Sequence, residues 1–233
     1  PGVYPIEITN AKTGAERRIN LFVMAPFDPD RASLNGYRIG HYEAKALHGR
    51  AIYTPPEALM PVTQQTIDAR LSPHFTIGQF LCHQQPEHWP KYVRVRPQLV
   101  AKLEAVLSTL GERGIRAETL TVMSGFRTPQ YNIDIGNTTS YSRHLYGGAA
   151  DIFVDTNDDG RMDDLNGDGH VDIEDARWLA DLIAGIGPTK LGDGAAIVVV
   201  TAAGTVAVVC IAFDIGPTKS GSACNTTADS GSA

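Results

Sequence analysis

The chain has 233 residues, enough for one substantial core, and carries a net charge of −6. This acidic balance excludes the broad basic surface that nucleic acids and anionic membranes attract, so we predict neither partner. The most apolar stretch, residues 195–213, is rich in valine and interrupted by Thr201, Gly204 and Thr205, which favours one or two buried strands over a membrane span.

Residues 1–70 are predicted to form a small β-rich N-terminal module with a connector. Short β-like runs at 3–8, 19–24 and 37–42 are separated by asparagine, glycine, proline and aspartate. The dipeptide Asn35-Gly36 is a strong signal for a tight turn between two strands. No function can be assigned to this module from its residues.

The pattern changes to mixed helix and strand after residue 70. The run 97–110 predicts a helix, because its leucines and valines recur at helical spacing while Lys102 and Glu104 are left for the exposed side. A strand is expected over 119–123 and a second helix over 173–183. Side chains that follow a strand end are common site residues, which directs attention to the segment after 123.

The segment from Ser142 to Asp151 carries the strongest chemical signal. The imidazole of His144 and the carboxylate of Asp151 are suitable zinc ligands, and the small residues between them let the backbone turn closely. A catalytic zinc ion requires a third protein ligand and an open position for water. These two residues therefore make an incomplete site by themselves.

Three motifs, in order, resemble those of the zinc D-Ala-D-Ala carboxypeptidase family, whose domain has a hedgehog-type fold. The pattern Ser-x-His-x-x-Gly-x-Ala-x-Asp at 142–151 resembles the family's zinc-ligand signature. Ser-Gly-Phe-Arg-Thr-Pro at 124–129 resembles its upstream Ser-Gly-Tyr/Phe-Arg-Ser/Thr-Pro element, and residues 74–80 resemble the segment that opens the domain. Together the matches span roughly residues 72–155.

The resemblance implies an α+β domain over 71–219, with a small antiparallel sheet and flanking helices. It implies that His144, Asp151 and a later histidine hold Zn²⁺. Arg127 would bind the substrate carboxylate or polarise the scissile carbonyl, and Ser142 would also contact substrate. The implied substrate is a D-Ala-containing peptidoglycan stem peptide, which places the protein in the periplasm or outside the cell.

The late zinc ligand is where the sequence departs from the family. The best match to the expected histidine-containing strand is 211–215, in which Ala212 stands at the histidine position. No histidine follows His170, and no glutamate follows Glu174 to act as a general base. His170 itself is more consistent with an exposed loop residue than with the missing ligand.

The composition also changes after residue 190, where small and apolar residues dominate. The peptide Ile-Gly-Pro-Thr-Lys occurs twice, at 186–190 and 215–219, and residues 220–233 form a low-complexity tail. Both a true low-complexity end and a shifted reading frame remain open.

Because the third zinc ligand is missing, the alternative to a peptidase is a non-catalytic, calcium-stabilised cell-wall binding domain with a degenerate zinc site. A secreted domain that binds through its N-terminal module is a third possibility.

An acidic insertion at 155–175 predicts calcium binding. From Asp164, oxygen side chains stand at loop positions one, three, five and twelve with glycine at position six, as a calcium loop requires. The front half of this pattern also occurs from Asp155. The loops resemble dockerin-type and thrombospondin type 3 loops, and the expected role of Ca²⁺ is structural. The predicted ligands are Asp155, Asn157, Asp159, Asp164, Asn166, Asp168 and Asp175.

Overall fold

The computed structural model describes residues 1–186, 195–201 and 207–213. The predicted class is confirmed, since the chain forms small antiparallel sheets with few helices. The apolar stretch near the end forms two strands, β10 (Ala195–Thr201) and β11 (Ala207–Phe213). Among the helices of the described residues, none is long and apolar enough to cross a membrane.

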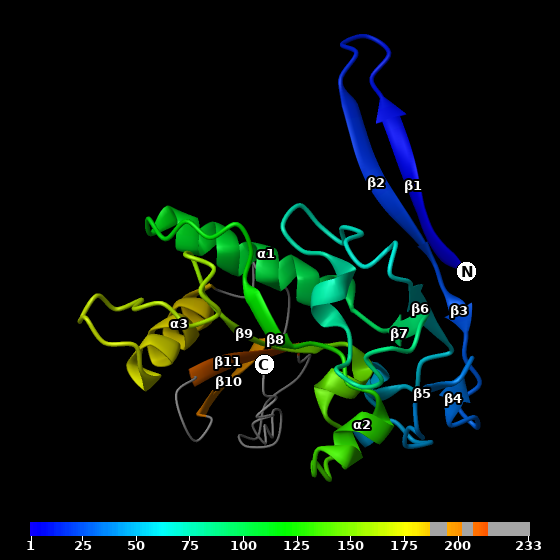
Figure 1. The fold of residues 1–233 in the computed structure, drawn as a ribbon. Helices are drawn as coiled ribbons and strands as arrows, with labels where there is room; N and C mark the ends of the chain where they lie inside the picture. The colour runs from blue at the N-terminus through cyan, green and yellow to red at the C-terminus, as the bar shows by residue number, and fades with distance from the viewer. Residues whose placement is uncertain (187–194, 202–206, 214–233) are drawn as a thin grey trace.

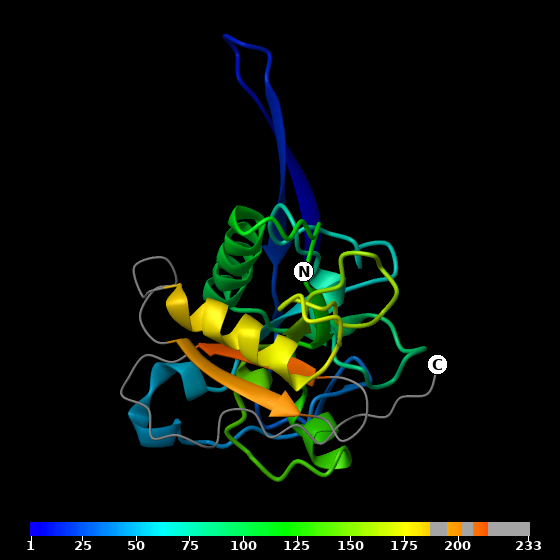
Figure 2. The ribbon, with the colours of Figure 1, turned by 90° about the vertical axis from the view of Figure 1, so that its left-hand side faces the viewer.

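An N-terminal hairpin projects from the rest of the molecule (Figures 1 and 2). Its strands β1 (Gly2–Thr9) and β2 (Glu16–Val23) pair antiparallel, which confirms the first two predicted β-runs. Because residues directly opposite each other share a face, the pairs Tyr4–Leu21 and Ile6–Ile19 give the hairpin one apolar face. These four side chains are all exposed, which is why this part of the chain adds little to the core.

The Asn35-Gly36 turn is confirmed. It joins β4 (Ser33–Leu34) to β5 (Tyr37–Arg38), and both turn residues have positive φ, 49° and 82°, as this two-residue connection requires. The prediction of a strand over 37–42 is wrong beyond Arg38. Gly40 has a φ of 80°, which is not extended, and a Cβ there would lie 2.6 Å from the backbone nitrogen of Gln130.

A three-stranded sheet lies in the order β3–β6–β7, with β3 (Ala25–Pro26), β6 (Ala58–Val62) and β7 (Lys91–Val93). Its buried Leu59 and Val93 belong to the same hydrophobic cluster as Leu103 of the first long helix. The core is therefore continuous across residue 70, and a domain boundary at that point stays a prediction.

A four-stranded antiparallel sheet in the order β10–β11–β9–β8 forms the centre of the second half, with β8 at Thr121–Ser124 and β9 at Ala149–Phe153. The two predicted helices are confirmed as α1 (Pro97–Glu112) and α3 (Ile173–Gly185). Both contact β11 and each other, and Figure 2 shows α3 lying along β10 and β11. The shorter helical segments are η1 (Leu47–Gly49), η2 (Ala51–Tyr53), η3 (Ile77–Phe80), α2 (Pro129–Asp134) and η4 (Arg143–Tyr146).

The expected exposure of Lys102 is wrong, because this side chain is only 1% exposed. Lys102 lies three residues after Leu99 and four before Val106, so helical spacing places it on the buried stripe of α1. Its long aliphatic stem can pack along apolar neighbours. The charge of lysine led to the wrong prediction that Lys102 is exposed, whereas its helical position correctly indicates burial.

Glu104 on α1 anchors the segment before η3. Its Oε1 accepts the backbone N–H of His74 at 3.0 Å, and its Oε2 lies 2.6 Å from the His74 Nδ1. Burial raises the pKa of Glu104, but hydrogen bonds from Ser72 and His74 outweigh it and hold the pKa below its ordinary value of 4.5. The carboxylate is therefore favoured in the folded protein.

Glu104→Gln is expected to lower the free energy of unfolding at pH 7 by about 1 kcal/mol, since it weakens hydrogen bonds to a charged acceptor. Because the folded-state pKa is depressed, this stabilisation is present above pH 4.5 and is lost as pH falls through the lower folded value. Urea unfolding of both proteins at neutral and acidic pH measures it. An equal difference at both pH values would contradict the assignment.

Candidate metal centre

Two sequence-predicted ligands meet at the centre of the four-stranded sheet. Asp151 lies on β9, between β8 and β11, and His144 lies on η4, just before β9 in the chain. Both side chains are fully buried. The Gly147 turn, with a φ of 68°, reverses the chain between them, as the small residues of this segment predicted.

The two carboxylate oxygens of Asp151 have different surroundings. Its Oδ2 accepts a hydrogen bond from the Arg127 Nη2 at 2.7 Å. Its Oδ1 lies 3.4 Å from the His144 Nε2 and has no hydrogen-bond partner among the described residues. A buried carboxylate oxygen without a donor is unfavourable unless a cation or a proton faces it.

The tautomer of His144 is set by its other nitrogen. The Nδ1 lies 2.7 Å from the carbonyl oxygen of Gly125, and because a carbonyl can only accept, Nδ1 carries the proton. In the neutral ring the Nε2 lone pair then faces the Asp151 Oδ1. A histidine that donates its second N–H to a backbone carbonyl is the usual arrangement of a metal-bound imidazole.

The separation of the two donor atoms also fits zinc. Ligand atoms about 2.0–2.1 Å from a tetrahedral ion lie about 3.3 Å apart. The observed Nε2–Oδ1 distance between His144 and Asp151 is 3.4 Å. These two residues therefore present a nitrogen and an oxygen donor at the spacing that a zinc ion requires.

Arg127 and Ser142 were predicted to contact substrate. The structure places Arg127 against protein groups: its Nη2 donates to Asp151 and its Nε donates to the Ser124 Oγ at 2.8 Å. Ser142 directly precedes η4 and is buried, and its Oγ has no hydrogen-bond partner in the described part of the chain. Their contacts with substrate stay predictions.

Side chains that the sequence analysis did not identify donate hydrogen bonds to the loop that carries His144. The Tyr42 hydroxyl donates to the Leu145 carbonyl at 3.1 Å, and burial raises the pKa of Tyr42 so that it keeps this proton. Arg96 donates to the carbonyl oxygens of Tyr146 and Ile52. No local pattern marks these residues, because their partners lie about 40 to 100 positions away.

The Gly125 carbonyl was also missed as a functional group. The Ser-Gly-Phe-Arg motif directed attention to the Arg127 side chain, whereas a backbone oxygen of the same motif orients His144. A Cβ at Gly125 would lie 2.7 Å from the Phe80 Cα, so only glycine fits where this backbone passes η3. A glycine two residues before the predicted substrate contact Arg127 was the available signal.

The strand predicted to carry the third ligand lies next to Asp151. In the register of β11 with β9, Ala212 is paired with Ala149 and Cys210 is paired with Asp151. Paired positions share a face of the sheet, and so do alternate positions along a strand. Position 212 is therefore a neighbour of position 151 in the sheet, and its side chain lies outside the described residues.

The acidic segment folds into two tight loops. Asp155 accepts the backbone N–H groups of Asp159 and Gly160, and Asp164 accepts those of Gly167 and Gly169. Donation from Gly169 lowers the pKa of the exposed Asp164 below its ordinary value of 3.8. In both loops the first aspartate is therefore bonded to the backbone of the glycine at position six.

Asp175, predicted as the last calcium ligand, is fully buried at the start of α3. Its Oδ1 accepts the N–H groups of Leu165 and Asn166, and its Oδ2 accepts that of Asp172. Asp172 and Asp175 together form the capping box of α3. Asp175 thus closes the loop onto the helix, and its calcium-binding role stays a prediction.

No group of three or more His, Cys, Asp or Glu side chains is arranged to hold a metal ion within the residues whose side chains the structure describes. This holds for the His144–Asp151 pair and for both acidic loops. Within these residues His144 and Asp151 offer two donor atoms, and their role as zinc ligands stays a prediction.

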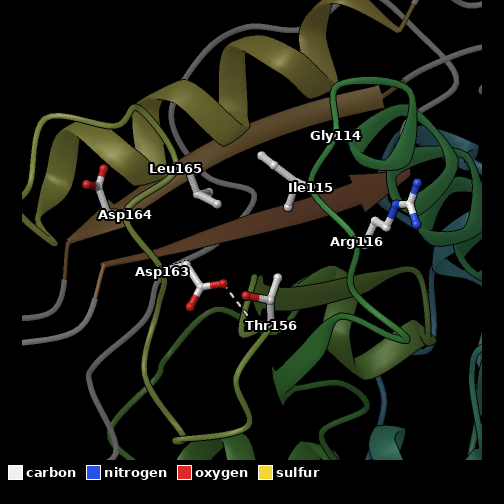
Figure 3. A pocket seen from close by; sticks show the side chains of 7 residues that line it. All are labelled: Gly114, Ile115, Arg116, Thr156, Asp163, Asp164 and Leu165. Atoms are coloured by element: carbon white, nitrogen blue, oxygen red, sulfur yellow. Dashed lines mark hydrogen bonds between the residues drawn. The ribbon is translucent and has the colours of Figure 1, made fainter.

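A pocket of about 320 Å³ lies between the segment after α1 and the acidic loops. Figure 3 shows the side chains that line it. The pocket contains neither His144 nor Asp151. The Asp163 carboxylate accepts the Thr156 N–H at its wall, and Arg116 lies at the opposite side. The lining residues are Gly114, Ile115, Arg116, Thr156, Asp163, Asp164 and Leu165.

Comparison with known families gives a match over part of the chain. Residues 73–167 match the family model described as Peptidase M15. The matched segment is less than half of the chain, and it contains Ser124, Arg127, His144 and Asp151, the four side chains that meet at the candidate centre. No curated protein and no solved structure gives a significant match.

Gly147→Ala is expected to reduce the free energy of unfolding by about 1–3 kcal/mol, because the residue has positive φ and its Cβ would lie 2.4 Å from the Arg94 carbonyl oxygen. Gly148→Ala is the matched control, since its Cβ would approach no atom closer than 3.5 Å. Urea unfolding compares the two variants. Equal losses would show that the Gly147 turn does not constrain this loop.

Proposed function

We propose that the chain is a zinc-dependent peptidase that hydrolyses D-Ala-containing peptidoglycan stem peptides. The observation that carries this proposal is the buried pair of His144 Nε2 and Asp151 Oδ1, 3.4 Å apart, with the other imidazole nitrogen bonded to a carbonyl. The Peptidase M15 match over residues 73–167 supports it, because that family suggests a metallopeptidase with D-Ala-D-Ala peptidase activity.

His144 and Asp151 would hold the zinc ion, which supplies Lewis-acid chemistry by activating water and polarising a peptide carbonyl. Burial of the pair excludes bulk water from the donor atoms and strengthens every charge interaction there. Arg127 keeps positive charge within reach of the carboxylate, and the guanidinium is the predicted partner of the substrate. Because stem peptides lie outside the cytoplasm, the proposed location is periplasmic or extracellular.

One specific observation favours a second candidate, a non-catalytic cell-wall binding domain with a degenerate zinc site. Ala212 stands where a histidine is expected, and no histidine follows His170 in the sequence. Position 212 is paired with Ala149 of β9. With alanine there, zinc would have only His144 and Asp151 of its three expected protein ligands. The two candidates differ in cleavage, not in fold.

The peptidase is tested with purified protein, zinc, and a stem peptide that ends in D-Ala-D-Ala. The expected result is about one equivalent of bound zinc and release of D-Ala that a chelator abolishes. His144→Ala and Asp151→Asn should each reduce cleavage at least about 100-fold, since each removes a predicted ligand. Arg17→Met on the exposed hairpin is the control and should leave cleavage unchanged.

The outcomes separate the candidates. Zinc binding without cleavage, together with retention on insoluble peptidoglycan, would favour the binding domain. Wild-type protein that neither binds zinc nor cleaves the peptide would contradict the peptidase.

We further propose that the acidic segment binds Ca²⁺ and stiffens the connection between β9 and α3. Its support is the loop pattern of oxygen side chains with a glycine at position six, repeated from Asp155 and Asp164. Calcium would neutralise carboxylates that repel one another across these short loops. The fixed connection would in turn steady the strand that carries Asp151.

Calcium at about 100 times its dissociation constant is expected to stabilise the protein by about 2.7 kcal/mol, measured as a rise in thermal unfolding temperature. A double variant, Asp164→Asn with Asp168→Asn, should lose most of this gain. Asp158→Asn is the control, because Asp158 lies in the first loop but is not a predicted ligand. If the unfolding temperature of the wild-type protein did not change when calcium was added, the proposal would be contradicted.

A further inference from the structure

Arg127 contacts both predicted zinc ligands. Its side chain donates through Nη2 to the Asp151 Oδ2 at 2.7 Å, and its backbone N–H donates to the His144 carbonyl oxygen at 3.3 Å. Arg127 is only 5% exposed, so these contacts are made away from bulk water. One residue therefore joins the loop of His144 to the strand of Asp151.

The guanidinium is itself held in place. Its Nε donates to the Ser124 Oγ at 2.8 Å, and Ser124 is paired with Asp151 in the register of β8 with β9. The register shifts between Val122 and Ser124, a bulge of the kind that re-aims a side chain. Ser124, Arg127 and Asp151 thus form a chain of hydrogen bonds across two adjacent strands.

These hydrogen bonds fix the orientation of the Asp151 carboxylate toward His144. With Oδ2 occupied by the guanidinium, the carboxylate presents Oδ1 toward the imidazole Nε2 at 3.4 Å. The planar guanidinium donates in a fixed geometry, so it restrains rotation of the carboxylate more strongly than a lysine ammonium would. Groups that orient a ligand in this way typically change metal affinity about 10–100-fold when removed.

We propose that Arg127, held by Ser124, is a positioning residue that preorganises Asp151 for zinc. This inference rests on the proposed zinc site and goes beyond the substrate contact expected from the family resemblance. Two of the guanidinium nitrogens are bonded to protein oxygens, so orienting Asp151 is the principal role and any contact with substrate is additional.

The test is the zinc dissociation constant, measured by competition with a chromophoric chelator on metal-free protein. Arg127→Met should weaken zinc binding about 10–100-fold. Arg127→Lys should also weaken it, because an ammonium on a flexible stem restrains the carboxylate less than the planar guanidinium does. Ser124→Ala should weaken it by a smaller factor, since it removes only the support. Arg17→Met on the exposed hairpin should bind zinc like wild type.

Circular dichroism and thermal unfolding of each metal-free protein show whether it folds. If Arg127→Met does not fold, Arg127→Lys and Ser124→Ala carry the test. Wild-type zinc affinity in the folded Arg127 variants, with an effect only on the KM for the stem peptide, would overturn the inference and leave the zinc site intact. A wild-type protein that binds no zinc would instead contradict the proposed function.

Discussion

The carboxylate of Asp151 is the constraint on which the rest of this site depends. It is fully buried on an inner strand, so its charge must be met by groups that reach it through the protein. Arg127 meets one oxygen, and the His144 imidazole lies near the other. Removing one partner of a buried ion pair is strongly destabilising, whereas the intact pair adds little net stability. Stability alone is therefore a weak explanation of this arrangement, and the proposed zinc ion would supply another.

The strands and turns around Asp151 place the groups that contact it. β8 ends at Ser124 and passes into the turn that carries the Gly125 carbonyl and Arg127, while η4 and the Gly147 turn bring His144 back beside β9. Helices α1 and α3 cover the sheet (Figure 1), and the acidic loops connect β9 to α3. Each of these elements carries a group of the candidate site or packs against the sheet that holds Asp151.

Much of the fold follows from local pattern. The periodic apolar residues of α1 and α3, the first two β-like runs and the Asn35-Gly36 turn each express a preference of a few neighbouring residues, and all are confirmed. The predicted ligands His144 and Asp151 were also accessible, because one segment of eight residues carries both. Helical spacing alone also places Lys102 on the buried stripe of α1, in agreement with its burial.

The remainder depends on long-range contacts that no short window contains. The Gly125 carbonyl orients His144 across 19 residues of sequence, and Tyr42 supports the same loop across 103. The partner of Arg127 became apparent only when β8 and β9 were seen side by side. Sequence reasoning thus predicted the two candidate ligands, and the packing around them accounts for the orientation of their side chains.

The most direct test of the central claim is X-ray absorption at the zinc edge, recorded on the zinc-loaded protein and on His144→Ala. The expected spectrum has nitrogen and oxygen ligands at about 2.0–2.1 Å with imidazole outer-shell scattering, and that scattering should weaken or vanish in the variant. A stoichiometric zinc ion whose spectrum is unchanged by loss of His144 would contradict the account.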